Sequence, residues 1–231
     1  MLTVVPTPIG NLRDITLRAL DVLKAADLII CEDTRHTQKL LTAYEIKKPL
    51  MSFHEHSAPG KVKEILTMLG EGKNLALVSD GGTPLISDPG FQIVHEAILA
   101  KLPYAVLPGA SAFTTALAAS GLATDAFSFF GFLPQKSAAR RKFLSGLMER
   151  EETLIFYESP YRLVQTLETM KEIFGEREAV VARELTKMFE EIQRGALADL
   201  AAKFSAKKVL GEIVVLVSGK DRKNLFGEKK Q

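Results

Sequence analysis

The chain has little cysteine and no long apolar run, and each absence excludes a class of protein. Its one cysteine, Cys31, lies in an apolar segment, which predicts a buried thiol in a reducing compartment and not a catalytic one. Because no C-x-x-C pair or Cys/His spacing typical of zinc occurs, we expect no metal site. The apolar runs are too short to cross a bilayer, and the first residues lack the basic start of a signal peptide. We therefore expect a cytoplasmic protein without a membrane partner.

The common nucleotide-binding motifs are missing as well. A dinucleotide fold would carry G-x-G-x-x-G after its first strand, but the first apolar run here leads into Pro6-Thr7-Pro8-Ile9-Gly10. A Walker motif is also absent. The formal charge of +2 is close to balance, so net charge alone does not indicate a nucleic-acid-binding protein. With 231 residues and 46% hydrophobic content, the chain can form one large or two modest domains.

Short apolar runs alternate with amphipathic helical patterns along most of the chain. The alternation indicates an α/β fold, and in the first half it predicts an open parallel sheet with helices on both faces. In the first half we expect strands at 2–5, 28–31, 50–53, 75–78 and 104–107, and helices at 16–26, 34–44, 61–69, 91–100 and 112–119. In the second half we expect strands at 127–133, 153–157, 179–182 and 213–217, and helices at 137–149, 162–174 and 196–204. The turn-forming segment 120–125 predicts a boundary between two α/β domains, 1–120 and 121–231.

The most informative stretch follows the predicted strand at 75–78. That strand stops at an acidic, glycine-rich turn, Asp80 to Pro84, and a second turn, Ser87 to Gly90, opens a helix. Adjacent glycines let the backbone approach a ligand closely, because no Cβ stands in the way. A strand, loop and helix in this order are typical of a ligand crevice at the carboxyl end of a parallel sheet. We interpret the stretch as part of a crevice that Pro8 and Ser111 also line, with two plain tight turns as the alternative.

Five short motifs at predicted strand ends and turns are specific as a set. They are Thr7 to Leu12, Glu32-Asp33-Thr34-Arg35, Ser79 to Gly90, Phe132-Leu133-Pro134 and Ala182 to Lys187. With these motifs, residues 1 to about 219 resemble the small-subunit ribosomal RNA methyltransferases of the tetrapyrrole methylase superfamily. The resemblance implies two α/β domains with the cofactor, S-adenosyl-L-methionine, in the crevice between them. It also implies a homodimer that methylates the ribose 2′-hydroxyl of a cytidine in 16S ribosomal RNA.

The resemblance further implies which residues contact the cofactor. These are Pro8, Gly81, Gly82, Thr83, Ile86, Ser111, Ala112, Glu158 and Leu185. For Glu158 the alternative is a solvated turn before Ser159-Pro160. Ser111 can also serve as a helix N-cap, and the two roles are compatible.

Methyl transfer from a sulfonium to a hydroxyl is an in-line displacement, so holding the reactants in line supplies about 7–11 kcal/mol. A general base typically adds about 10²–10⁴-fold. The candidate catalytic bases are Glu32 and Asp33, which follow the second predicted strand at the edge that faces the crevice. The alternative for this pair is a plain helix start, and His54 and His56 remain alternative bases.

An RNA substrate requires cations along its backbone. The candidate RNA-binding residues are Arg35, Lys136, Arg140, Arg141, Arg183 and Lys187. Two rival functions stay open: a tetrapyrrole or other small-molecule methyltransferase, and a non-catalytic RNA-binding protein of ribosome assembly. Tetrapyrrole enzymes typically have a glycine-rich first loop, which this chain lacks, and the intact 80–90 segment disfavours a non-catalytic protein.

Overall fold

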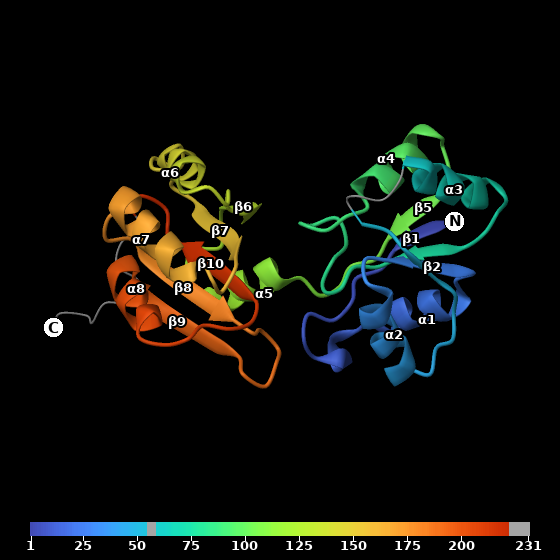
Figure 1. Cartoon of the computed structure of the whole chain (residues 1–231), viewed down its shortest axis with the longest axis horizontal. Coiled ribbons are helices and arrows are strands. Elements are labelled where there is room, and N and C mark those ends of the chain that lie inside the picture. The colour runs from blue at the N-terminus through green and yellow to red at the C-terminus, as the bar shows by residue number, and fades with distance from the viewer. Residues whose placement is uncertain (55–58, 222–231) are drawn as a thin grey trace. The chain divides into compact units, whose positions relative to one another are not determined.

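In a computed structural model, which describes residues 1–54 and 59–221, the chain divides into two compact units (Figure 1). The first unit runs from Met1 to Ser111 and the second begins at Ala112. Each unit contains one five-stranded sheet and its own helices. None of the helices among the described residues is long and apolar enough to cross a membrane.

The first unit is a parallel sheet covered by helices on both faces. Its strands, in the order β3-β2-β4-β1-β5, are β1 (Leu2–Val4), β2 (Leu28–Cys31), β3 (Leu50–Ser52), β4 (Leu75–Leu77) and β5 (Tyr104–Val106). Helices α1 (Leu17–Ala25) and α2 (Thr34–Ala43) pack on one face, and α3 (Pro59–Gly70) and α4 (Phe91–Leu99) pack on the other. A short 3-10 helix, η1 (Leu12–Asp14), precedes α1. Because both faces are covered, the central strands β1 and β4 are buried along their whole length and do not alternate between buried and exposed residues.

The second unit has a mixed sheet in the order β6-β7-β10-β8-β9. Its strands are β6 (Phe127–Phe132), β7 (Thr153–Glu158), β8 (Glu178–Arg183), β9 (Glu191–Ala196) and β10 (Ile213–Val217). Its helices are α5 (Ala112–Ser120), α6 (Ser137–Ser145), α7 (Leu163–Phe174) and α8 (Leu197–Ser205). Strands β6 and β7 are parallel, and the other neighbouring strands are antiparallel.

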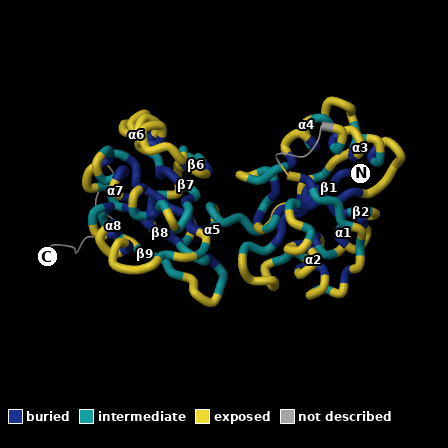
Figure 2. Tube along the Cα trace, in the orientation of Figure 1, coloured by how far each residue is buried: buried dark blue, intermediate teal, exposed yellow. Residues whose placement is uncertain are grey.

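The core of the second unit lies mainly between its sheet and α6, α7 and α8. Phe156, Val181 and Val215 belong to this core and come from the three neighbouring strands β7, β8 and β10. Ile155, Val180 and Leu216, which are their neighbours on the same strands, are also buried and point to the opposite face. Figure 2 shows buried stretches of the trace beside the labels β7 and β8. Helix α5 packs against these strands, so both faces of the central strands are covered.

The structure confirms the predicted α/β class and most predicted elements. The first sheet is parallel, as its strand–helix alternation predicts, and the second sheet, for which the sequence indicated no strand direction, is mixed. The division between the units falls before α5, whereas the sequence placed it after residue 120. The physical reason is that α5 packs on the second sheet: the Phe113 ring stacks on that of Phe129, with centroids 4.5 Å apart. In addition, the Arg194 guanidinium donates to the Ser120 carbonyl at 2.8 Å.

Candidate functional site

Four loops meet at the carboxyl edge of the first sheet, because the strands that precede them are parallel and adjacent. Two of these loops are joined by an antiparallel bridge between Thr7, after β1, and Gly82, after β4. The bridge consists of two backbone hydrogen bonds, each 2.9 Å long. The Thr7 hydroxyl also donates to the carbonyl of Ser79 at 3.1 Å. The sequence motif at Thr7-Pro8 therefore supports the glycine-rich turn directly.

The remaining two loops are tied to the same turn. The Thr83 hydroxyl donates to the carbonyl of Ala110, after β5, at 3.0 Å. The backbone N–H of Asp33, after β2, donates to Oδ1 of Asp80 at 3.2 Å. All four loops thus form one hydrogen-bonded network centred on residues 79–83.

The predicted cofactor residues of the first unit differ in what they offer a ligand. Gly81 is exposed. Gly82 is buried, and both its N–H and its carbonyl are hydrogen-bonded to the backbone of Thr7. Gly82 has φ +88°, a conformation that disfavours side chains, so it shapes the turn while Gly81 presents open backbone. Pro8 and Ser111 are half-buried. Ile86 is exposed and offers an apolar surface.

The segment between the two turns is strained and folds back on the sheet. Leu85 and Ser87 have φ values of 77° and 67°, which are rare for residues other than glycine. Gly90 has φ +118°, and a Cβ there would lie 3.0 Å from side-chain atoms of both Leu77 and Leu85. Strain of this kind persists only where the surrounding structure enforces it, and it is concentrated at ligand sites.

This fold-back brings Asp88 close to other carboxylates at the sheet edge. Burial raises the pKa of Asp88 to about 6. The neighbouring Ser79 hydroxyl partly offsets this, and the charges of Glu32 and Asp80 raise the pKa further. The edge is therefore negatively charged, suits a cationic ligand, and holds one carboxylate that titrates near neutral pH. Sequence reasoning gave Asp88 no role, because its approach to Glu32 depends on the fold of the loop.

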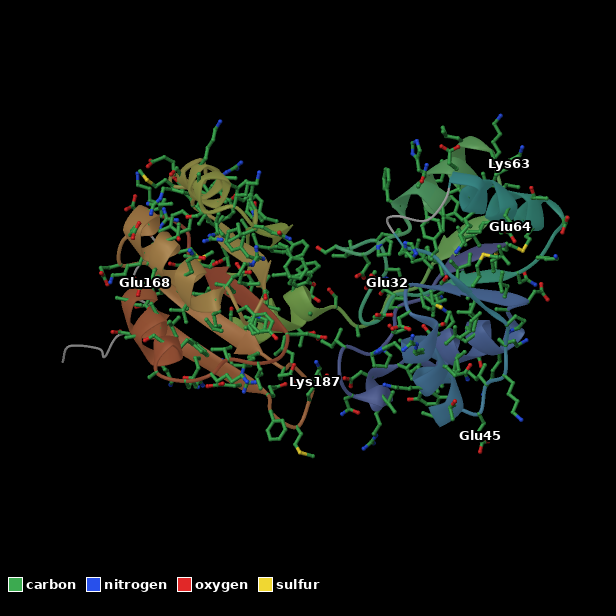
Figure 3. The ribbon with its side chains drawn as sticks, viewed as in Figure 1. Glu32, Glu45, Lys63, Glu64, Glu168 and Lys187 are labelled. Carbon is green, nitrogen blue, oxygen red and sulfur yellow. The ribbon has the colours of Figure 1, made fainter. Side chains whose placement is uncertain are left out.

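The predicted catalytic pair, Glu32 and Asp33, follows β2 as expected, and the two residues differ in burial and in local role. Asp33 is the N-cap of α2, and its Oδ1 accepts the Arg35 backbone N–H at 2.7 Å. Glu32 is half-buried at the carboxyl end of the strand (Figure 3). Of the alternative bases, His54 is described and His56 lies outside the described residues. Among the described residues, no group of three or more His, Cys, Asp or Glu side chains could hold a metal ion.

In the second unit, the Glu158 carboxylate is buried in a complete set of hydrogen bonds. It accepts the Ser159 backbone N–H at 2.7 Å and the Thr166 hydroxyl at 2.6 Å, and it pairs with Arg162 at 2.7 Å. The alternative of a solvated turn is therefore wrong for Glu158, and its side chain fixes the junction of β7 and α7. Leu185 is buried, and Ala112 is the half-buried first residue of α5.

The predicted RNA-binding cations fall into three groups. Arg35 and Lys136 are exposed, and Arg141 is exposed but pairs with Glu172. Arg183 pairs with Glu191 at 3.1 Å, and Lys187 pairs with Glu184 and Glu212 at 3.0 and 3.1 Å. Burial by itself would lower the pKa of Lys187, but its hydrogen bonds to these carboxylates raise it above the ordinary value.

The third group is Arg140 alone, which is fully buried in the second unit. Its Nη1 donates to the Gln135 carbonyl at 3.4 Å. A guanidinium enclosed by the fold cannot neutralise a phosphate outside it. The RNA-binding prediction is therefore corrected at Arg140, where the helical pattern gave no sign that the charged side chain faces inward.

Known proteins resemble this chain along most of its length. The family model of the tetrapyrrole (corrin/porphyrin) methylases matches residues 1–201. The chain is 48% identical to ribosomal RNA small subunit methyltransferase I of Thermotoga maritima, over 95% of this chain and 99% of that protein. Identity to the proteins of the same name from Vibrio cholerae and Bacillus subtilis is 50% and 46%. These two alignments cover 95% and 99% of this chain, and 77% and 78% of the relatives.

Solved structures show the same fold at low sequence identity. The cobalt precorrin-4 methyltransferase CbiF matches with a TM-score of 0.70 at 18% identity, and the match covers 94% of each chain. The methyltransferase CobJ matches with the same TM-score at 20% identity, over 97% of each chain.

Proposed function

Since the chain belongs to the tetrapyrrole methylase family, we propose that it is an S-adenosylmethionine-dependent methyltransferase acting on the ribosomal RNA of the small subunit. The observation that carries the proposal is identity of 46–50% to three ribosomal RNA small subunit methyltransferases, over at least 95% of this chain. We further propose that the acceptor is the ribose 2′-hydroxyl of a cytidine in 16S ribosomal RNA. A homodimer is part of the same proposal.

The carboxyl-edge loops of the first unit fit S-adenosylmethionine by their chemistry. The cofactor would supply a methyl group on a positively charged sulfonium. Carboxylates at this edge attract such a charge, while Gly81 offers backbone and Ile86 offers an apolar surface. Gly82 and Thr83 would hold the shape of the turn through the network described above, and Pro8 follows Thr7, the partner of Gly82 in that network. For Ser111, Ala112, Glu158 and Leu185, cofactor contact stays a prediction from the resemblance.

The chain's own residues would contribute positioning and a place for the released proton. Holding donor and acceptor in line supplies about 7–11 kcal/mol, more than the roughly 3–5 kcal/mol expected from a base. Asp33 is committed to the start of α2 as its N-cap, whereas Glu32 is half-buried at the end of β2 and its charge acts on Asp88 at the carboxyl edge, so we take Glu32 as the first candidate of the predicted pair. It would accept the proton of the ribose hydroxyl as the oxygen attacks the methyl group.

The direct test is methyl transfer from labelled S-adenosylmethionine to small ribosomal subunits that lack the modification. We expect label in one cytidine, located by mapping the product. A subunit carrying one 2′-deoxycytidine at that position should accept no label, because the 2′-hydroxyl is the proposed acceptor. Transfer to the deoxy substrate would place the chemistry on the base and contradict the ribose assignment. Absence of transfer to any subunit RNA, with a tetrapyrrole accepted instead, would favour the small-molecule alternative.

A further inference from the structure

A groove on the solvent side of α2 is distinct from the loops at the carboxyl edge. It has a volume of about 770 Å³ and is lined by Thr34, Arg35, Gln38, Lys39, Thr42, Ala43 and Leu50. The helical members form two rows, 34-38-42 and 35-39-43, in which successive residues are four apart. Residues at this spacing are neighbours on a helix surface, so the lining is a continuous strip along α2.

The charge of this α2 groove is positive. Its lining contains two cations, Arg35 and Lys39, and no carboxylate. Between Thr34 and Leu50 the chain carries Lys47 and Lys48 in addition, against the single acid Glu45. In the part of the chain that the structure describes, neither Arg35 nor Lys39 forms an ion pair, and both are exposed. These two side chains therefore remain available to an anionic partner.

The α2 groove adjoins the predicted catalytic pair, because its first lining residue, Thr34, directly follows Asp33 in the sequence. Asp33 caps α2 through the Arg35 backbone N–H, and its own N–H donates to Asp80 in the glycine-rich turn. A strand bound along α2 would therefore run directly from the carboxyl edge of the sheet. Gln38 and Thr42 add amide and hydroxyl groups to the strip, and they are hydrogen-bonded to each other at 3.3 Å.

We propose that the α2 groove binds the sugar–phosphate backbone of the RNA strand next to the target nucleotide. Arg35 and Lys39 contact phosphates, and Ala43 and Leu50 contact the sugars. The Thr42 hydroxyl donates to the Gln38 carbonyl at 2.7 Å and accepts from the Gln38 amide, so it holds that amide in place while the second amide N–H of Gln38 donates to a sugar or phosphate oxygen. The inference rests on the proposed function, because it takes ribosomal RNA as the substrate. A chain of phosphates suits the strip because its two cations, Arg35 and Lys39, are four residues apart and so lie about 6 Å apart along the helix axis.

The test compares Lys39→Ala with Lys63→Ala in the full chain. Lys63 is exposed on α3, which covers the opposite face of the same sheet (Figure 3), so both variants lose one exposed cation. Affinity for unmodified small subunits is measured between 50 and 200 mM salt. Log affinity falls as log salt rises, and the slope is steeper when more phosphates are contacted. For Lys39→Ala we expect this slope to become less steep by about 0.7–0.9, the value of one phosphate contact. For Lys63→Ala we expect no change.

Steady-state methyl transfer gives the second readout. Lys39→Ala should raise KM for the subunit several-fold and leave kcat unchanged, because backbone contacts position the RNA without touching the reacting atoms. Equal salt slopes for the two variants would overturn the inference. A changed sedimentation coefficient for Lys39→Ala with an unchanged slope would also overturn it, and would make the groove a contact between copies of the chain. If the wild type transfers no methyl group, the proposed function fails. The salt slopes of the two variants then decide alone whether the α2 groove binds RNA.

Discussion

At the scale of single residues, the carboxyl edge of the first sheet depends on how close its carboxylates lie. Asp88 is far from Glu32 in sequence, but the strained 85–90 segment brings their charges within reach of each other. Like charges and partial burial both disfavour ionisation of Asp88. A bound cation would relieve this repulsion, which is one reason why the edge fits a sulfonium ligand.

The raised pKa of Asp88 predicts a pH dependence of stability. The folded-state pKa is about 6 against an ordinary value of 3.8, so the folded protein holds this proton more tightly than the unfolded chain. The free energy of unfolding should therefore fall as pH rises from about 4 to 6, with the full penalty present above 6. Asp88→Asn should make this fall shallower and raise stability at pH 7, because the neutral amide carries no charge to bury or repel. Urea unfolding across this range measures it, with Asp21→Asn on the surface of α1 as the control. Equal pH profiles in wild type and Asp88→Asn would refute it.

A second residue-scale prediction concerns Glu32. Glu32→Gln keeps the side-chain size but cannot accept a proton, so kcat should fall by up to about 10²–10⁴-fold with little change in S-adenosylmethionine affinity. Glu64→Gln is the matched control, because Glu64 is exposed on α3 at another face of the same unit (Figure 3). Single-turnover methyl transfer and calorimetric titration separate the two effects. Full rates in both Glu32→Gln and Asp33→Asn would show that neither carboxylate is the base.

At the scale of elements, the glycine-rich turn offers a test with a matched control. Gly82 and Gly72 have nearly the same φ, +88° and +86°, but only Gly82 lies in the proposed cofactor loop. Alanine at either position should cost about 1–2 kcal/mol of stability through backbone strain. We expect Gly82→Ala to weaken S-adenosylmethionine binding in calorimetry and Gly72→Ala to leave it unchanged. The same affinity in both variants would remove the turn from the cofactor site.

Several elements could be predicted from the sequence, and the others show why some could not. The strands of the first unit are short apolar runs bounded by turns, so their positions follow from local pattern, and the helices between them predict that they run parallel. By contrast, β9 contains Glu191, Gln193 and Arg194 at the edge of its sheet, and no apolar alternation marks it. Its existence depends on pairing with β8, which is a non-local contact.

The site shows the same division between local and non-local information. The sequence motifs of the first unit located the loops of the site, because each of these loops comes directly after an apolar strand. The hydrogen bonds that join the loops, from Thr7 to Gly82 and from Thr83 to Ala110, link residues distant in sequence. The inward direction of Arg140 and the enclosed network of Glu158 likewise depend on packing within the second unit. Contacts of this kind cannot be predicted from the spacing of residues along the sequence.

At the scale of the whole molecule, two units with separate cores divide the work that we propose. The first unit carries the glycine-rich turn, the candidate base and the α2 groove. In the second unit, several predicted RNA cations are instead tied to neighbouring carboxylates. With a net charge of only +2, the chain has no strong overall attraction for RNA, so local cations such as Arg35 and Lys39 would decide how the RNA is held.

The central place of β10 has a consequence for how the protein is made. Residues 213–217 come last among the strands in the sequence, yet they lie between β7 and β8 in the second sheet. As the chain leaves the ribosome, the first sheet is complete once β5 has emerged, but β7 and β8 keep open edges until β10 follows. Open edges pair readily with other chains, so the nascent second unit is the aggregation-prone part. A chain cut before Ile213 would keep all strands of the first sheet and lack the central strand of the second.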